Sequence, residues 1–370
     1  MVDILKILKL ARSQISPANK QLLYLAFEDD FDLLIDLLED TAKDRLPSDA
    51  DIRQEYATTL KDNGNFLTLL DIQYPKLLKQ IDTAPIVLSI KGNNDILGRQ
   101  SVAVVGSRCI SKEDINFIQP AVKTLNNADF VVISGLARGT DAIAHINSIE
   151  TGTIAVLPCG LGNCYPQEHL FIANKIIENG GAIISELAFN EQSKQYHFIQ
   201  RNRIIVAISN AVLCCRARDL KSGTISSANY AIKYNKSIYT HIFNSNSDGN
   251  KWLLNNGAID IDDFDNLSYS IMVDVARNTI LSQENGKKTI NNKTNSGNLF
   301  SAQNKTHNTT NIPHKSLKNE IDKLIKYSNL TKTEKNLKQI LFLCNQFQVD
   351  EKDILTILIP EIFGKKQSNN

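Results

Sequence analysis

Arginine, lysine and glycine recur in short motifs whose residue types are suited to binding phosphate. A guanidinium forks onto phosphate oxygens, a lysine supplies a point charge, and glycine lets the backbone approach an anion closely. The motifs are Gly106-Ser107-Arg108, Ser134-Gly135 to Asp141, Tyr196-His197-Phe198-Ile199-Gln200-Arg201-Asn202-Arg203 and Lys221-Ser222-Gly223-Thr224. Because no motif contains a pair of carboxylates, we expect a phosphate-binding surface with no catalytic residue.

The first motif is not the glycine fingerprint of a dinucleotide-binding fold. Arg108 occupies the approach that a pyrophosphate would need. A mononucleotide or a nucleic-acid phosphate fits this motif better than a dinucleotide does. A structural turn that carries a surface arginine and binds no ligand explains the motif equally well. The segment around Gly135 and the segment Lys221-Ser222-Gly223 each offer backbone amides at the start of an expected helix, where anions bind.

The motif around Phe198 interleaves aromatic rings with guanidinium groups. This combination holds single-stranded nucleic acid, because bases stack on the rings while cations follow the backbone. The structural alternative is that Phe198 packs inward while Arg201 and Arg203 make ion pairs. Scattered solvated charge is likewise an alternative for the wider basic cluster, which is formed by Lys194, Arg201, Arg203, Arg216, Arg218 and Lys221.

Asp141 and His145 lie one helical turn apart and so share a helix face. They could form an oriented acid/base pair. We favour a structural arrangement, in which Asp141 is stabilised near the helix N-terminus and His145 is bonded to it.

Short β-branched runs alternate with helical stretches from residue 102 to residue 240 and must position these motifs. The runs are 102–105, 131–133, 153–157, 182–184, 211–214 and 237–240. This alternation predicts an α/β fold with a doubly wound, mostly parallel sheet. The motifs follow the strands, so we expect them at the carboxyl ends, where such sheets bind ligands.

Apolar periodicity and composition divide the chain into four parts. We predict a helical N-terminal domain over 1–65, the sheet domain over 66–275, a flexible linker over 276–316 and a small helical C-terminal domain over 317–370. The linker is rich in Asn, Thr, Ser and Lys, which cannot offset the entropy of ordering.

Composition indicates a globular protein of the cytoplasm that binds no membrane. Its 370 residues carry a net charge of +1, and no stretch approaches the length of a membrane helix or resembles a signal peptide. The 6 cysteines include no CxxC pair, so we expect Cys159, Cys164, Cys214 and Cys215 to act as small apolar residues. We predict no metal and no cofactor.

These motifs, with Tyr165-Pro166, Ser185-Glu186 and residues 250–258, occur in the order and approximate spacing of the DNA processing protein A (DprA, also Smf) family. The sequence resembles this family over most of residues 66–265. The resemblance implies an extended Rossmann-like domain in a homodimer. It also implies binding of incoming single-stranded DNA during natural transformation, its protection from nucleases, and help in loading the recombinase RecA.

Carried over to this sequence, the resemblance implies phosphate contacts from arginines and lysine, base stacking on Phe198, and backbone amides from glycine and serine. The predicted DNA-binding residues are Gly106, Ser107, Arg108, Gly135, Phe198, Arg201, Asn202, Arg203, Lys221, Ser222 and Gly223. The chain departs from the family pattern at Thr140, Ile199, Gln200, Arg216 and Ile242. We expect Arg216, which stands where an acidic residue is common, to add to the positive cluster.

The alternative function is an enzyme on a related Rossmann-like scaffold that cleaves the base–sugar bond of a nucleotide. Asp141, His145 or Glu186 would then serve as acid or nucleophile.

Overall fold

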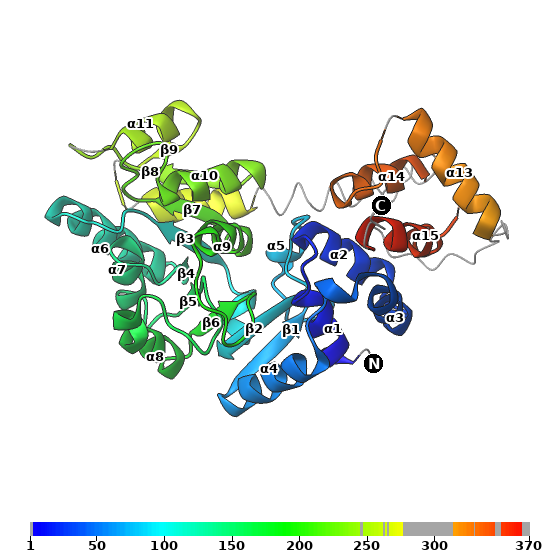
Figure 1. Ribbon diagram of the computed structural model, residues 1–370. Coiled ribbons are helices and arrows are strands. Elements are labelled where there is room, and N and C mark those ends of the chain that lie inside the picture. The colour runs from blue at the N-terminus through cyan, green and yellow to red at the C-terminus, as the bar shows by residue number, and fades with distance from the viewer. Residues whose placement is uncertain are drawn as a thin grey trace. The chain divides into compact units, whose positions relative to one another are not determined.

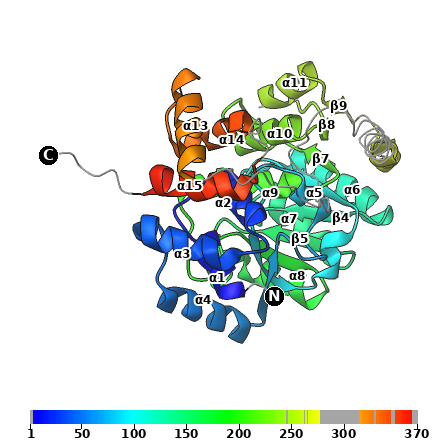
Figure 2. The same cartoon turned by 90° about the vertical axis from the view of Figure 1, so that its right-hand side faces the viewer.

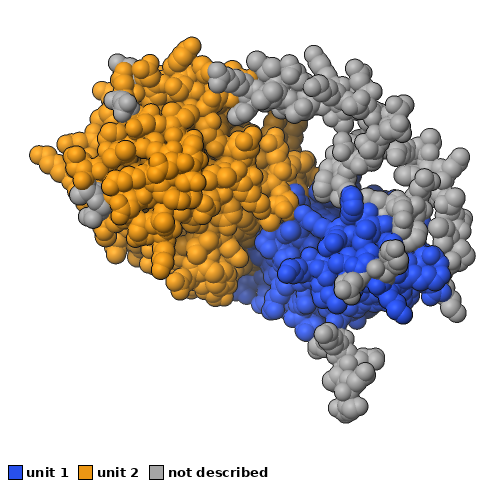
Figure 3. Space-filling model, turned by 90° about the horizontal axis from the view of Figure 1, so that it is seen from above, with its two compact units in different colours: residues 1–54, 297–370 blue, residues 55–296 orange. Residues whose placement is uncertain are grey.

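The computed structural model describes residues 3–244, 247–261, 263–264, 266–276, 314–328, 330–344 and 349–364. The chain forms two compact units, shown in different colours in Figure 3. Unit 1 comprises residues 1–54 and 297–370, and unit 2 comprises residues 55–296. Helix α4 (Asp49–Lys61) spans the boundary between the two ranges.

Unit 2 is built on a nine-stranded sheet in the order β1-β2-β6-β5-β4-β3-β7-β8-β9. The strands are β1 (Gly64–Thr68), β2 (Val87–Gly92), β3 (Ser101–Val105), β4 (Val131–Ser134), β5 (Thr153–Val156), β6 (Ala182–Ser185), β7 (Ala211–Cys214), β8 (Ser237–Thr240) and β9 (Ile259–Asp260). Strand β2 pairs antiparallel with its neighbours β1 and β6. All other neighbouring pairs, in the sheet order β6-β5-β4-β3-β7-β8-β9, are parallel. The predicted doubly wound, mostly parallel α/β sheet is confirmed.

Helices cover both faces of this sheet (Figure 1). Those between consecutive parallel strands are α6 (Lys112–Asn127), α7 (Thr140–Ile146), α8 (Leu170–Glu178), α9 (Gln195–Ile208), α10 (Gly223–Lys233) and α11 (Asp248–Asn255), and the short α5 (Lys76–Lys79) precedes β2. The chain moves from β3 toward β6, then crosses back through α9 to β7 on the other side of β3. Because crossovers are right-handed, this reversal puts α6 to α8 on one face and α9 with α10 on the other.

Apolar side chains alternate between the two faces of the central strands. Val102 and Val104 of β3 pack with Phe117 and Ile118 of α6 in one buried cluster. Strand β3 is buried along its whole length, as expected of a parallel strand covered on both faces. The core therefore fixes the strand ends from which the predicted site residues project.

Unit 1 is helical and joins segments from both ends of the sequence. It contains α1 (Ile4–Ala11), α2 (Pro17–Ala26), α3 (Phe31–Ala42), η1 (Lys43–Arg45), α13 (His314–Tyr327), η4 (Glu334–Asn336), α14 (Leu337–Cys344) and α15 (Glu351–Phe363). Helix α15 lies between α14 and α3, as Figure 2 shows. The Glu334 carboxylate accepts a hydrogen bond from the Ser16 amide at 2.5 Å and pairs with Arg45 at 3.0 Å.

The structure thus corrects the division into separate N- and C-terminal helical domains, since both belong to unit 1. Local periodicity showed each group of helices but not their mutual packing, which depends on contacts between residues about 300 apart. Most of the predicted linker over 276–316 lies outside the described residues, and helix α13 begins at His314, inside the predicted range.

Three of the four cysteines expected to act as apolar residues, Cys159, Cys214 and Cys215, are buried, and Cys164 is half-buried. Burial raises the pKa of the Cys159 thiol to about 11 and that of Cys214 to about 12, so both stay protonated at neutral pH. No helix in the described part of the chain is long and apolar enough to cross a membrane.

Candidate nucleic-acid interface

The loops after β3 and β7 leave the sheet at the point where its strand order reverses. Strand β3 pairs with β4 on one side and β7 on the other, and the following connections run in opposite directions. Ligands of open α/β sheets bind at such a position. The exposed Arg218, after β7, donates a hydrogen bond to the Cys109 carbonyl at 2.8 Å and so joins the two loops.

The tight turn after β3 presents Arg108 to solvent. The Ser107 hydroxyl donates to the Cys109 carbonyl at 2.7 Å, and its carbonyl accepts from the Thr140 amide at 3.1 Å. A Cβ at Gly106 would lie 2.4 Å from the Thr140 hydroxyl, so this position requires glycine. Gly106 and Ser107 therefore shape the turn.

Arg108, Phe198 and Tyr165 form an exposed group of a cation and two rings, which we call the Arg108 cluster. The Arg108 guanidinium carbon lies 5.0 Å from the centroid of the Phe198 ring, within the range of a cation–π contact. The Tyr165 ring meets Phe198 edge to face, with centroids 5.1 Å apart. Phe198 is half-buried and Tyr165 is exposed, so the group combines stacking surface with positive charge.

Tyr165 is part of a motif shared with the family but was not predicted to bind DNA, because the loop after β5 has the composition of an ordinary loop. Its aromatic residue, placed after a parallel strand, was the available signal.

Arg201 and Arg203 are buried, each with about 5% of its surface exposed. Arg201 donates to the Val156 carbonyl at 2.7 Å, and burial lowers its pKa to about 10. Arg203 forms an ion pair with Glu186, which follows β6. The structure therefore corrects the predicted phosphate contacts of both arginines. Helix α9 is buried around most of its circumference, so these side chains reach inward to polar groups at the ends of β5 and β6.

Gly135 accommodates Arg201 and does not offer a free amide. A Cβ at residue 135 would lie 1.5 Å from Nη1 of Arg201. The Gly135 amide donates to the Asp141 carboxylate at 3.1 Å, and the Ala137 amide donates to the same oxygen at 3.3 Å. The predicted anion-binding amide of Gly135 is thus already satisfied by a carboxylate of the protein.

His145 is fully buried, and both of its ring nitrogens have structural partners. Nε2 accepts from the Leu136 amide at 3.3 Å, and Nδ1 lies 2.8 Å from the Thr153 hydroxyl, which itself donates to the Val132 carbonyl. These bonds place the single proton on Nδ1, and burial lowers the pKa of His145 to about 3. Asp141 and His145 therefore bond to the backbone and to Thr153, and the expected bond between them is not formed.

Arg216 is buried and adds no positive charge to the surface. It forms ion pairs with Asp114 and with Glu113, the latter at 2.7 Å, and its guanidinium lies 4.3 Å from the Phe243 ring centroid. The expectation that Arg216 extends the positive cluster is wrong. Its partners begin helix α6, so the residue instead fastens the loop after β7 to that helix.

Lys221 and Gly223 are exposed at the start of α10. Among the described residues, no carboxylate oxygen lies within 4.0 Å of the Lys221 ammonium. The Ser222 hydroxyl caps the helix by accepting a hydrogen bond from the Ile225 amide at 3.4 Å. Asn202, on α9, donates to the Gly223 carbonyl at 3.5 Å. The start of α10 is thus tied to the helix turn that follows Phe198.

Comparison with known proteins identifies the family. The model of the family "DNA recombination-mediator protein A" matches residues 65–271. The chain belongs to this family. The DprA of Streptococcus pneumoniae is 35% identical over 196 residues, which cover 52% of this chain and 68% of that protein. The Smf protein of Escherichia coli is 34% identical, over 50% of this chain and 51% of its own.

Solved structures of the DprA family share the fold. DprA from S. pneumoniae superposes with a TM-score of 0.60 at 27% identity, covering 72% of this chain and 98% of that one. DprA from Helicobacter pylori gives a TM-score of 0.52 at 29% identity, covering 57% and 97%. The structure of the H. pylori protein is described as giving insight into its single-stranded DNA binding mode.

Proposed function

We propose that this DprA-family protein binds single-stranded DNA through the Arg108 cluster and Lys221. The observation that carries the proposal is the exposed Arg108 guanidinium over the Phe198 ring, at the edge of the sheet where the strand order reverses. Rings and cations together bind a single strand without demanding a sequence, because every base has a face to stack and every nucleotide has a phosphate.

The family supports a role in natural transformation. In this proposal the protein acts as a homodimer in the cytoplasm, protects incoming single strands from nucleases and helps load the recombinase RecA. The binding mode described for the H. pylori relative supports the choice of single-stranded DNA.

The buried arginines connect α9 to the ends of two strands. Arg201 donates a hydrogen bond to the carbonyl at the end of β5, and Arg203 forms an ion pair with Glu186 after β6. Both come from α9, the helix that carries Phe198. We propose that they position the Arg108 cluster, whereas Arg108 and Lys221 contact phosphate.

A double variant tests the site directly. We expect Arg108→Ala with Lys221→Ala to weaken binding by similar factors for oligonucleotides of unrelated sequence, and to reduce the salt slope of binding by about 1 per cation removed. Fluorescence anisotropy at several salt concentrations measures both. Lys123→Ala, which removes an exposed lysine of α6, is the matched control. Unchanged affinity in the double variant would refute the proposed site.

The rival base–sugar cleavage gains no support from the three groups considered for it. His145 is buried and neutral, Glu186 is paired with Arg203, and Asp141 accepts backbone amides. Incubation with nucleoside monophosphates and NAD, followed by detection of free base, separates the two functions. Sustained release of base that disappears in Glu186→Gln would favour the enzyme.

A further inference from the structure

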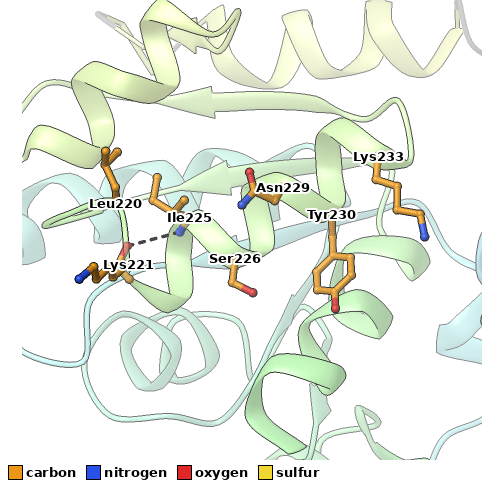
Figure 4. Close-up of a pocket in the computed structure, with 8 residues that line it drawn as sticks. Leu220, Lys221, Ile225, Ser226, Asn229, Tyr230 and Lys233 are labelled. Atoms are coloured by element: carbon orange, nitrogen blue, oxygen red, sulfur yellow. Dashed lines mark hydrogen bonds between the residues drawn. The ribbon is translucent and has the colours of Figure 1, made fainter. Parts of the chain in front are cut away.

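A groove of about 390 Å3 runs along one side of helix α10, beyond Lys221 (Figure 4). Its lining residues are Leu220, Lys221, Ser222, Ile225, Ser226, Asn229, Tyr230 and Lys233. We propose that the DNA strand continues from the Arg108 cluster past Lys221 into this groove, where Tyr230 stacks a base and Lys233 binds a phosphate. The inference rests on the proposed function and extends its site by several nucleotides.

The charges along the groove favour a polyanion. Lys221 and Lys233 lie at its two ends, and none of the eight lining residues is acidic. Lys233 forms an ion pair with Asp82 at 3.5 Å, and both side chains are more than half exposed. Such exposed pairs contribute little to stability, so a phosphate can compete for this ammonium.

Tyr230 supplies the aromatic surface that a base requires. It is half-buried, and its ring is held nearly parallel to that of Tyr234, with centroids 5.9 Å apart and an angle of 23° between the planes. A ring that is already held in place loses little freedom when a base stacks on it. Ser226 and Asn229, on the same side of the helix, offer hydrogen-bonding groups to a sugar or a base edge (Figure 4).

The groove is continuous with the proposed site. Asn202 follows Phe198 by one helical turn and donates to the Gly223 carbonyl, so the middle of α9 lies beside the start of α10. Helix α10 has 11 residues and is therefore about 16 Å long, which is enough to guide several nucleotides of a single strand.

Affinity measured against strand length tests the inference. Fluorescence anisotropy is recorded with oligothymidylates of roughly 6 and roughly 20 nucleotides, lengths that bracket the site sizes of single-strand binding proteins. We expect Tyr230→Ala with Lys233→Ala to bind the longer strand roughly tenfold more weakly and the shorter strand almost unchanged. Tyr230→Phe retains the ring and should bind both strands like the parent chain, as should the control Lys123→Ala.

Two results for the Tyr230→Ala, Lys233→Ala variant would refute DNA binding in the groove: unchanged affinity for the longer strand, or an equal loss of affinity for both strand lengths. The Arg108→Ala, Lys221→Ala variant separates this failure from failure of the proposed function. If that variant binds both lengths normally, the Arg108 cluster is not the site. If the Arg108→Ala, Lys221→Ala variant loses affinity for both strand lengths while the Tyr230→Ala, Lys233→Ala variant loses affinity for neither, only the path along α10 is refuted.

Discussion

Phe198 contacts both the Arg108 guanidinium and the ring of Tyr165, which it meets edge to face. Phe198→Ala removes the stacking surface, and we expect affinity for single-stranded DNA to fall roughly 5- to 150-fold, the range for one stacked base. Phe198→Tyr retains the ring and should retain most of the affinity. Anisotropy titration measures the change, with thermal unfolding to show that both variants fold. A folded Phe198→Ala protein of normal affinity would contradict base stacking here.

His145 makes stability depend on pH. Its pKa is about 3 in the folded protein and near 6.5 in the unfolded chain, so the unfolded state binds the additional proton between these values. The stabilisation is therefore complete above pH 6.5 and is lost as the pH falls toward 3. We expect a loss of about 2 kcal/mol from this residue between pH 7 and pH 5.

Urea unfolding at both pH values measures this contribution. His145→Gln destabilises the protein at neutral pH but removes the titrating group, so its stability should fall less between pH 7 and pH 5 than that of the parent chain. An equal fall in both proteins would show that His145 is not the group responsible.

At the scale of elements, the ion pair of Arg203 and Glu186 connects helix α9 to the end of β6. Arg203→Ala leaves the Glu186 carboxylate in a largely buried site, and removal of one partner of a buried pair costs about 3–5 kcal/mol. We expect a clear fall in the free energy of unfolding, measured by chemical denaturation.

Arg138→Ala is the matched control for this pair. Arg138 pairs with Glu168, and both side chains are more than half exposed, so its removal should leave stability close to that of the parent chain. Similar stabilities for Arg203→Ala and Arg138→Ala would argue against the structural role assigned to Arg203.

At the scale of the whole chain, unit 1 depends on helices from both ends of the sequence. Ending the chain after residue 313 removes α13, α14 and α15 and uncovers the face of α3 on which α15 packs. We expect the amides of α1, α2 and α3 to exchange hydrogen much faster, because their helices lose buried apolar contacts. Hydrogen exchange of the truncated and full chains tests this, and unchanged protection of α1 to α3 would contradict it.

Much of unit 2 could be predicted from the sequence, because a parallel strand covered on both faces must be apolar along its length. Strand β3 shows this pattern, and its buried residues follow the predicted run 102–105. The same pattern placed Arg108 and Lys221 after strands, where the structure has them exposed. The joining of α3 and α15 in one unit could not be predicted in this way, since periodicity within a helix does not identify its partner.

The sequence by itself determined which residue types stand at the strand ends: cations, glycines and an aromatic ring, without paired carboxylates. Only the tertiary structure decided which of the cations face solvent. Arg108 and Arg203 are the same residue type, yet Arg108 is exposed and lies over the Phe198 ring, whereas Arg203 pairs with a carboxylate in the interior. The physical reason is that burial depends on which elements pack around a side chain, and a guanidinium is stable in the interior only where that packing supplies a partner.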